Sequence, residues 1–103
     1  MKKSGLIIAA LGLAFTAAPA MASLELATKN ACTACHAVDK KLVGPSYKDV
    51  AAKYKGNAKA EAMLIEKVKK GGVGTWGQVP MPPNPNVKDP DVQTLVKWIL
   101  STK

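Results

Sequence analysis

The sequence predicts a small all-α domain of about four helices. Apolar residues recur at helical spacing in several segments, and no stretch shows the sustained alternation of a half-buried strand. Several of these segments also carry residues that start or stop helices. Of the 103 residues, the first 22 read as a separate leader, so the remaining 81 are enough for one domain.

The leader has the three parts of a secretory signal peptide. A basic start precedes an uncharged apolar run over residues 5–18, and the A-x-A site Ala20-Met21-Ala22 follows. The run is short of the roughly 20 residues that a membrane span needs. We expect cleavage before Ser23, so that residues 1–22 are removed and residues 23–103 form one domain in the periplasm. The alternative is an uncleaved membrane anchor.

The first two expected helices come early in this domain. Ser23 is a suitable N-cap for a helix that runs to about Ala31, with Glu25 in its first turn. After a loop, residues 47–54 read as a short helix that is closed by Gly56-Asn57.

The next two helices have clearer ends. Residues 58–70 form an amphipathic segment that stops at Gly71, with Met63, Ile65 and Val68 expected to point inward. The last helix starts at Asp89 as N-cap, followed by Pro90. We expect an apolar stripe on this helix to pack against the first helix, through Val92, Leu95, Val96 and Ile99 on one side and Leu24, Ala27 and Ala31 on the other.

The segment between these helices, residues 71–87, holds four prolines and four glycines. Loops of this length in small domains are usually functional or disordered. In this segment the prolines stiffen the backbone.

Cys32-Thr33-Ala34-Cys35-His36 has the spacing C-x-x-C-H, which is the attachment signature of haem c. Two thiols three positions apart reach the two vinyl groups at one edge of the porphyrin, and the next residue places an imidazole beneath the iron. His36 is the only histidine, and the motif uses both cysteines.

Three other readings of the cysteines remain. A redox dithiol of the thioredoxin kind needs a β-α-β setting that the sequence lacks. A zinc site would have at most three ligands, all close in sequence. A short structural disulfide in a haem-free binding module is the third, and it predicts a colourless protein.

A second axial ligand would close the iron site and favour electron transfer over catalysis. With no second histidine, the candidates in the mature domain are Met63 and Met81. Met63 lies at a helical spacing that suits core packing. Met81 stands between Pro80 and Pro82, and a stiff loop loses little entropy when it presents a ligand. The pattern therefore favours Met81.

The mature domain keeps 13 lysines and all 7 acidic residues, a net charge of +6. Lysine clusters such as Lys40-Lys41 would steer the protein toward an acidic partner surface. A nucleic-acid partner is disfavoured, because the lysines are scattered and no aromatic stacking platform is visible.

Four motifs in order resemble the small bacterial class I cytochromes c of the c-551/c-552 type. They cover essentially the whole mature domain and lie at residues 32–36, 43–51, 73–77 and 80–84. The resemblance implies an all-α class I cytochrome c fold around one covalent haem c, held through Cys32 and Cys35. It also implies axial ligation by His36 and Met81.

The resemblance further implies roles for polar groups around the haem. The Pro45 carbonyl would accept from the His36 ring, and the Trp76 indole would donate to a haem propionate, which Lys67 would also face. Asn84 would donate to the Met81 sulfur. Residues 84–87 are one residue longer than the usual family spacing, so Asn86 is the alternative donor.

Together these features predict a soluble, monomeric one-electron carrier of the periplasm, with no enzymatic activity and no membrane anchor. Its partners would be a membrane cytochrome complex as donor and a terminal reductase, oxidase or peroxidase as acceptor. The competing hypothesis is an enzyme or gas sensor with an open iron site, although the chain has no distal histidine or arginine to serve it.

Overall fold

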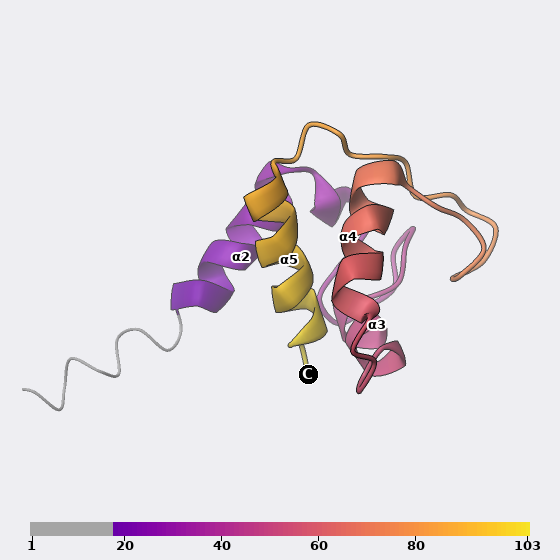
Figure 1. Ribbon diagram of the computed structural model, residues 1–103, viewed down its shortest axis with the longest axis horizontal. Helices are drawn as coiled ribbons and strands as arrows, with labels where there is room; N and C mark the ends of the chain where they lie inside the picture. The colour runs from indigo at the N-terminus through magenta and orange to yellow at the C-terminus, as the bar shows by residue number, and fades with distance from the viewer. Residues whose placement is uncertain (1–17) are drawn as a thin grey trace, which may run out of the picture.

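The computed structural model describes residues 18–103, which fold around four α-helices (Figure 1). A one-turn 3-10 helix, η3, follows the first of them, and the only β-type pairings among these residues are two isolated bridges. The all-α prediction is therefore confirmed. The elements are α2 (Ala18–Lys29), η3 (Cys32–Ala34), α3 (Tyr47–Lys53), α4 (Ala60–Lys70) and α5 (Asp89–Leu100).

Helix α2 begins at Ala18, so the prediction that Ser23 caps its start is wrong for the full chain. Ser23 lies inside the helix and is buried. The alanine-rich residues before it continue the helix, and Pro19 is tolerated because it lies in the first turn. Most of the expected signal peptide, residues 1–17, lies outside the described residues. From residue 18 onward, no helix is long and apolar enough to cross a membrane.

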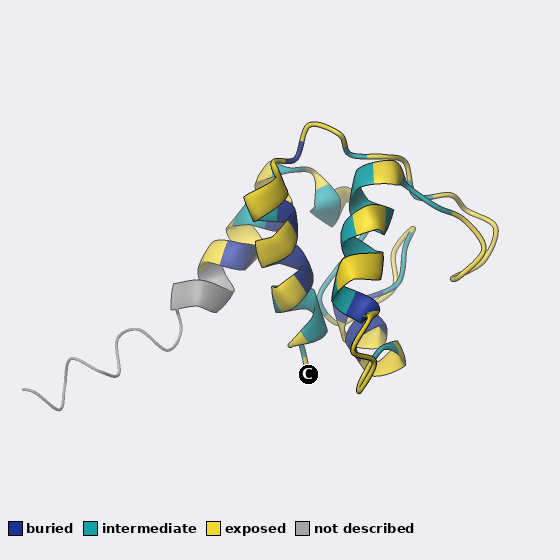
Figure 2. Cartoon of the chain, in the orientation of Figure 1, coloured by how far each residue is buried: buried dark blue, intermediate teal, exposed yellow. Residues whose placement is uncertain are grey.

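Helix α5 packs against α2, α3 and α4 and carries the core (Figure 2). Its residues Val92, Leu95 and Val96 are buried together with Ala27 of α2, as the stripe predicts. Two expected partners on the first helix are instead exposed. Leu24 is 41% exposed because the buried line of α2 runs through Ser23 and Ala27, one turn apart. Ala31 lies beyond the end of the helix and is also exposed.

Helix α4 presents a different face from the one expected. Its inner line runs through Ala60, Leu64 and Val68, which are spaced one turn apart. Ile65 also packs against the core, but Met63 is 37% exposed, so its assignment as an inward residue is wrong. As predicted, the helix ends at a glycine: Gly71 has φ 78°, and its N–H donates to Lys67.

The starts of α3 and α5 differ in how they are capped. The Ser46 hydroxyl accepts from Asp49 N–H at 3.0 Å, which completes the start of α3. Asp89 is already the first helical residue of α5, so the prediction that it is the N-cap is wrong by one position. Lys88 occupies the cap position with extended backbone, and its carbonyl accepts from Val92 N–H at 2.9 Å.

Candidate functional site

A cavity of about 390 Å³ lies between the helices and the two long connections. The two predicted attachment cysteines, Cys32 and Cys35, and the two predicted axial ligands, His36 and Met81, all line it. Its wall is mostly apolar and includes Val50 of α3, Leu64 and Val68 of α4, and Leu95 and Ile99 of α5. Met63 is not part of this wall and borders a smaller surface hollow instead. The structure thus brings the candidate attachment and ligand residues together, and it places only one of the two candidate methionines among them.

The attachment segment, residues 32–47, begins with a tight turn. Ala31 has a left-handed backbone, with φ 64°, which ends the preceding helix and lets the chain reverse. The Cys32 carbonyl accepts from the N–H groups of Cys35 at 3.2 Å and His36 at 3.0 Å. These bonds hold both thiols and the imidazole on one turn of backbone.

The His36 ring is fixed on several sides. Its Nδ1 lies 2.8 Å from the Pro45 carbonyl oxygen. Because a carbonyl can only accept, Nδ1 carries the proton, and Nε2 keeps a lone pair for a metal. A Cβ atom on Gly44 would lie 2.6 Å from His36 Cε1, so only glycine fits beside the ring.

Tyr47 joins this ring to the core. It stacks on His36 with a centroid distance of 5.4 Å and an interplanar angle of 23°, and it meets Trp98 of α5 edge-on at 5.3 Å. Burial raises the pKa of Tyr47, so the phenol stays neutral. Sequence reasoning did not single out Tyr47 or Gly44. The Gly44-Pro45 pair indicates a turn, but no local pattern in the sequence predicts that Gly44 lies against the His36 ring.

Burial also acts on the first cysteine. Burial is the main reason that the pKa of the Cys32 thiol is raised above its ordinary value. The two cysteines are not joined in a disulfide, and no group of three or more His, Cys, Asp or Glu residues within 18–103 is arranged to hold a metal ion. The arrangement therefore offers no support for the zinc reading.

The methionine loop, residues 71–87, is anchored at its base. Gly72 and Met81 form an antiparallel bridge, with N···O distances of 3.0 and 2.8 Å. The two arms come so close that a Cβ atom on Gly71 would lie 2.5 Å from the Met81 carbonyl oxygen. The backbone of Met81 is thereby held at the cavity wall.

Asn84 holds the same loop but does not line the cavity. Its side-chain amide donates to the carbonyls of Val68 and Pro82, both at 3.1 Å, and its backbone N–H also donates to Val68 at 3.0 Å. In the structure this amide therefore contacts two backbone carbonyls. Asn86 is exposed.

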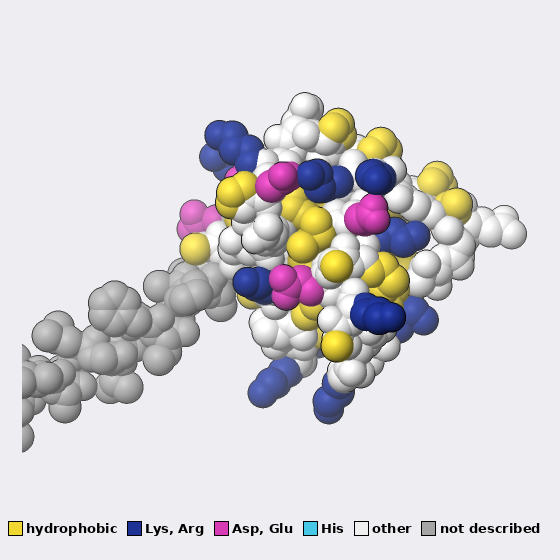
Figure 3. Space-filling model, viewed as in Figure 1, with side chains coloured by type: hydrophobic (Ala, Val, Ile, Leu, Met, Phe, Trp, Pro, Cys, Tyr) yellow, Lys and Arg dark blue, Asp and Glu magenta, His cyan; other side chains and the backbone are white. Residues whose placement is uncertain are grey.

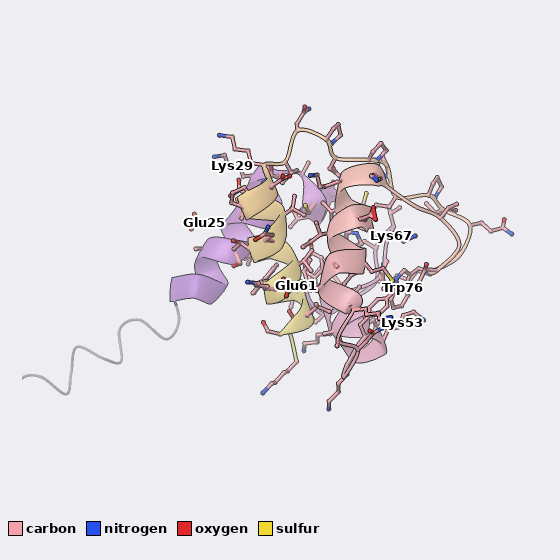
Figure 4. The ribbon with its side chains drawn as sticks, viewed as in Figure 1. Glu25, Lys29, Lys53, Glu61, Lys67 and Trp76 are labelled. Atoms are coloured by element: carbon pink, nitrogen blue, oxygen red, sulfur yellow. The ribbon has the colours of Figure 1, made fainter. Side chains whose placement is uncertain are left out.

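Trp76 and Lys67 both line the cavity from different elements (Figure 4). Trp76 stands in the outer part of the methionine loop and is 42% exposed. Lys67 comes from α4 and lies against Gly72, where an added Cβ atom would be 2.7 Å from the ammonium nitrogen. Both side chains thus border the cavity that would hold the bound group.

These residues fit a covalently bound haem. Two thiols share one turn with an imidazole, a thioether lines the same cavity, and the remaining wall is largely apolar with polar groups at a few points. A thioether and an imidazole are ligands that haem iron takes in electron-transfer proteins.

Comparisons with known proteins agree with this chemistry. The sequence profile of the cytochrome c family matches residues 22–103. The chain is 59% identical to cytochrome c-551 of Allochromatium vinosum over 88 residues. This alignment covers 84% of this chain and 94% of that protein. The chain is 48% identical over 103 residues to cytochrome c-552 of Nitrosomonas europaea, covering 100% of each.

The fold agrees as well. The crystal structure of Nitrosomonas europaea cytochrome c552 superimposes with a TM-score of 0.75 and 52% identity, covering 78% of this chain and 99% of that one. The chain therefore belongs to the cytochrome c family, whose members are electron carriers that bind haem c covalently.

Proposed function

We propose that this protein is a soluble periplasmic one-electron carrier. Its single haem c is attached through Cys32 and Cys35, with His36 and Met81 as axial ligands. The observation that carries the proposal is that these four side chains line one cavity, whereas Met63 does not. The haem iron supplies the reversible one-electron change when it is bound.

The residues of the attachment segment act on His36. The Pro45 carbonyl holds the ring proton on Nδ1 and increases the basicity of Nε2, while Gly44 and Tyr47 fix the plane of the ring. An imidazole held in this way keeps its position when the charge on the iron changes. Little rearrangement then accompanies each transfer.

The methionine loop would supply the second ligand to the haem iron through Met81 and would shape the reduction potential. A thioether is neutral and soft, so it favours the ferrous state and raises the reduction potential. Trp76 and Lys67, which both line the cavity, would interact with the propionates of a bound haem. Asn84 ties the loop to α4, and the donor to the Met81 sulfur would be Asn84 or Asn86.

Exposed apolar residues surround the mouth of the cavity, where electrons would leave. Val43, Val73 and Val79 line the cavity and are 55%, 60% and 65% exposed. Figure 3 shows lysine side chains spread over one face of the molecule, among apolar patches and several acidic side chains. This surface suits brief contact with an acidic redox partner. The donor would be a membrane cytochrome complex, and the acceptor a terminal reductase, oxidase or peroxidase.

The visible spectrum of the purified protein tests ligation. We expect a sharp c-type α band, a weak far-red sulfur-to-iron band in the oxidised form, and no response of the reduced form to carbon monoxide. Ready binding of carbon monoxide without the far-red band would reject this ligand set and favour an open-site enzyme or sensor.

The mass of the exported protein tests processing and attachment together. Residues 23–103 plus one haem are expected in the periplasmic fraction. A mass that includes residues 1–22 would contradict cleavage before Ser23, and an unmodified polypeptide mass would contradict covalent attachment.

A further inference from the structure

The outer part of the methionine loop has little backbone support. Every residue from 73 to 80 is exposed, and the hydrogen bond from Gly74 N–H to the Gly77 carbonyl, at 3.0 Å, is internal to the loop. No hydrogen bond in the described part of the chain joins these residues to a helix. Gly74 and Gly77 also have positive φ angles, 103° and 119°, with open space around them. Trp76 lies between these two glycines, so some other contact must keep it at the cavity.

Lys53, in the last turn of α3, provides such a contact. Its ammonium nitrogen lies 5.5 Å from the centroid of the Trp76 ring and 5.8 Å from that of Tyr54. Both distances fall within the range in which a cation is attracted to the face of an aromatic ring, and tryptophan is the strongest acceptor. Lys53 takes part in neither of the two side-chain ion pairs seen in residues 18–103. Figure 4 shows Lys53 and Trp76 next to each other, although they come from different elements.

The two rings give the lysine a defined place. Tyr54 follows Lys53 directly at the end of α3, is partly buried and lines the cavity. It is therefore a fixed support, whereas Trp76 belongs to the exposed loop. An ammonium group that contacts both rings links the loop to the helix.

We propose that Lys53 is a positioning residue that holds the Trp76 indole at the cavity by a cation–π contact. The inference rests on the proposed function in one respect, which is that the Trp76 indole held at the cavity would face a haem propionate. The contact requires a cation but not a lysine, so arginine should replace it and glutamine should not.

Hydrogen exchange of the two indole N–H groups in the reduced holoprotein tests this inference by NMR. In Lys53→Gln we expect exchange at Trp76 to be about two- to five-fold faster, the factor that corresponds to an exposed cation–π contact. Lys53→Arg should exchange as slowly as the wild type. Lys55→Gln is the matched control, since it removes the same charge from an exposed position two residues away.

The directions of the outcomes separate this role from its alternatives. Removing a positive charge alone slows exchange that is catalysed by hydroxide, so faster exchange at Trp76 is not a charge artefact. Trp98, which packs against the core, is the internal control. Unchanged exchange at Trp76 in Lys53→Gln, equal acceleration in Lys55→Gln, or equal acceleration at Trp98 would each overturn the proposal. The far-red band is recorded on the same samples, so failure of the Met81 ligation is seen separately.

Discussion

The attachment segment and the methionine loop meet at the same cavity, but they are built differently. The attachment segment is joined to the core: Tyr47 is only 2% exposed, and it connects His36 to Trp98 through two ring contacts. The methionine loop is exposed over residues 73–80 and is held mainly at its base. The proposed ligand His36 is therefore placed by packing, and the proposed ligand Met81 by a few hydrogen bonds around a stiff backbone.

This difference has a physical consequence for a redox site. A ligand fixed by packing changes little between variants, because close-packed interiors resist small displacements. A ligand on a loop is sensitive to each contact that holds the loop. We therefore expect changes in the attachment segment to affect folding, and changes in the methionine loop to affect ligation and potential.

Replacing Met81 should give the largest effect. Met81→Ala removes the thioether from the cavity wall, so we expect loss of the far-red band and binding of carbon monoxide by the reduced form. The reduction potential should fall by something on the order of 100 mV, since axial ligands set haem potentials over a wide range. Optical titration of the potential measures this. Met63→Ala is the control, because Met63 lies outside the cavity, and it should leave all three properties unchanged. The reverse pattern would identify Met63 as the ligand.

The attachment segment has no room beside His36. Gly44→Ala would place a Cβ atom 2.6 Å from His36 Cε1, and overpacking of this kind costs about 1–3 kcal/mol. Guanidinium unfolding of the holoprotein should show this loss, together with a shift of the Soret band as the imidazole moves. Gly56→Ala is the matched control: its φ is 78° but no atom lies within 4 Å, so it should lose about 1–2 kcal/mol with an unchanged spectrum. If Gly44→Ala were as stable as the wild type, the attachment segment would have shifted to make room for the added Cβ atom, and the packing around His36 would be less rigid than we infer.

Asn84 tests how the methionine loop is held. Asn84→Ala removes two donors to backbone carbonyls, and each such bond contributes about 1 kcal/mol. We expect a loss of about 1–2 kcal/mol and a far-red band that disappears at a lower temperature than in the wild type. Asn86→Ala should change stability little, because Asn86 is exposed. A larger shift of the reduction potential in Asn86→Ala than in Asn84→Ala would identify Asn86 as the donor to the sulfur.

The sequence was most informative where chemistry depends on neighbours in the chain. Cys32, Cys35 and His36 lie on one turn, so their spacing alone predicts their function. Met81 was favoured over Met63 from flanking prolines, and the cavity wall includes it. Helix ends were predicted less well. The start of α2 was placed too late, because the residues before Ser23 continue the helix. The N-cap of α5 was placed at Asp89, one position after the observed cap at Lys88.

Contacts between distant segments could not be read from local patterns. Leu24 and Met63 are apolar and helical, but which face of a helix is covered depends on the crossing of α5. Likewise, the partner of Asn84 is a carbonyl 16 positions earlier in α4. The role of Lys53 depends on a ring 23 positions later in an exposed loop, a separation that no periodicity encodes.

The smallest predicted effect concerns the base of the methionine loop. Lys69 at the end of α4 pairs with Asp89 at the start of α5, so the pair spans the two ends of the loop. Because the two side chains are 38% and 69% exposed, a double-mutant cycle of Lys69→Gln and Asp89→Asn should give a coupling below about 1 kcal/mol. In 1 M salt, where charges are screened within about 3 Å, that coupling should nearly vanish.

The control for this cycle lies within a single helix. Lys70 and Glu66 pair at 3.2 Å on α4 and span no loop, so their coupling should stabilise α4 by about 0.3–0.5 kcal/mol and leave the haem spectrum unaffected. If the Lys69–Asp89 pair helps to position Met81, its loss should weaken the far-red band on warming, while loss of the Lys70–Glu66 pair should not. Identical spectra for both pairs would show that the Gly72–Met81 bridge and the Asn84 bonds are sufficient to hold the ligand. The weakly supported part of the loop would then be its outer part alone, residues 73–80, where Lys53 contacts Trp76.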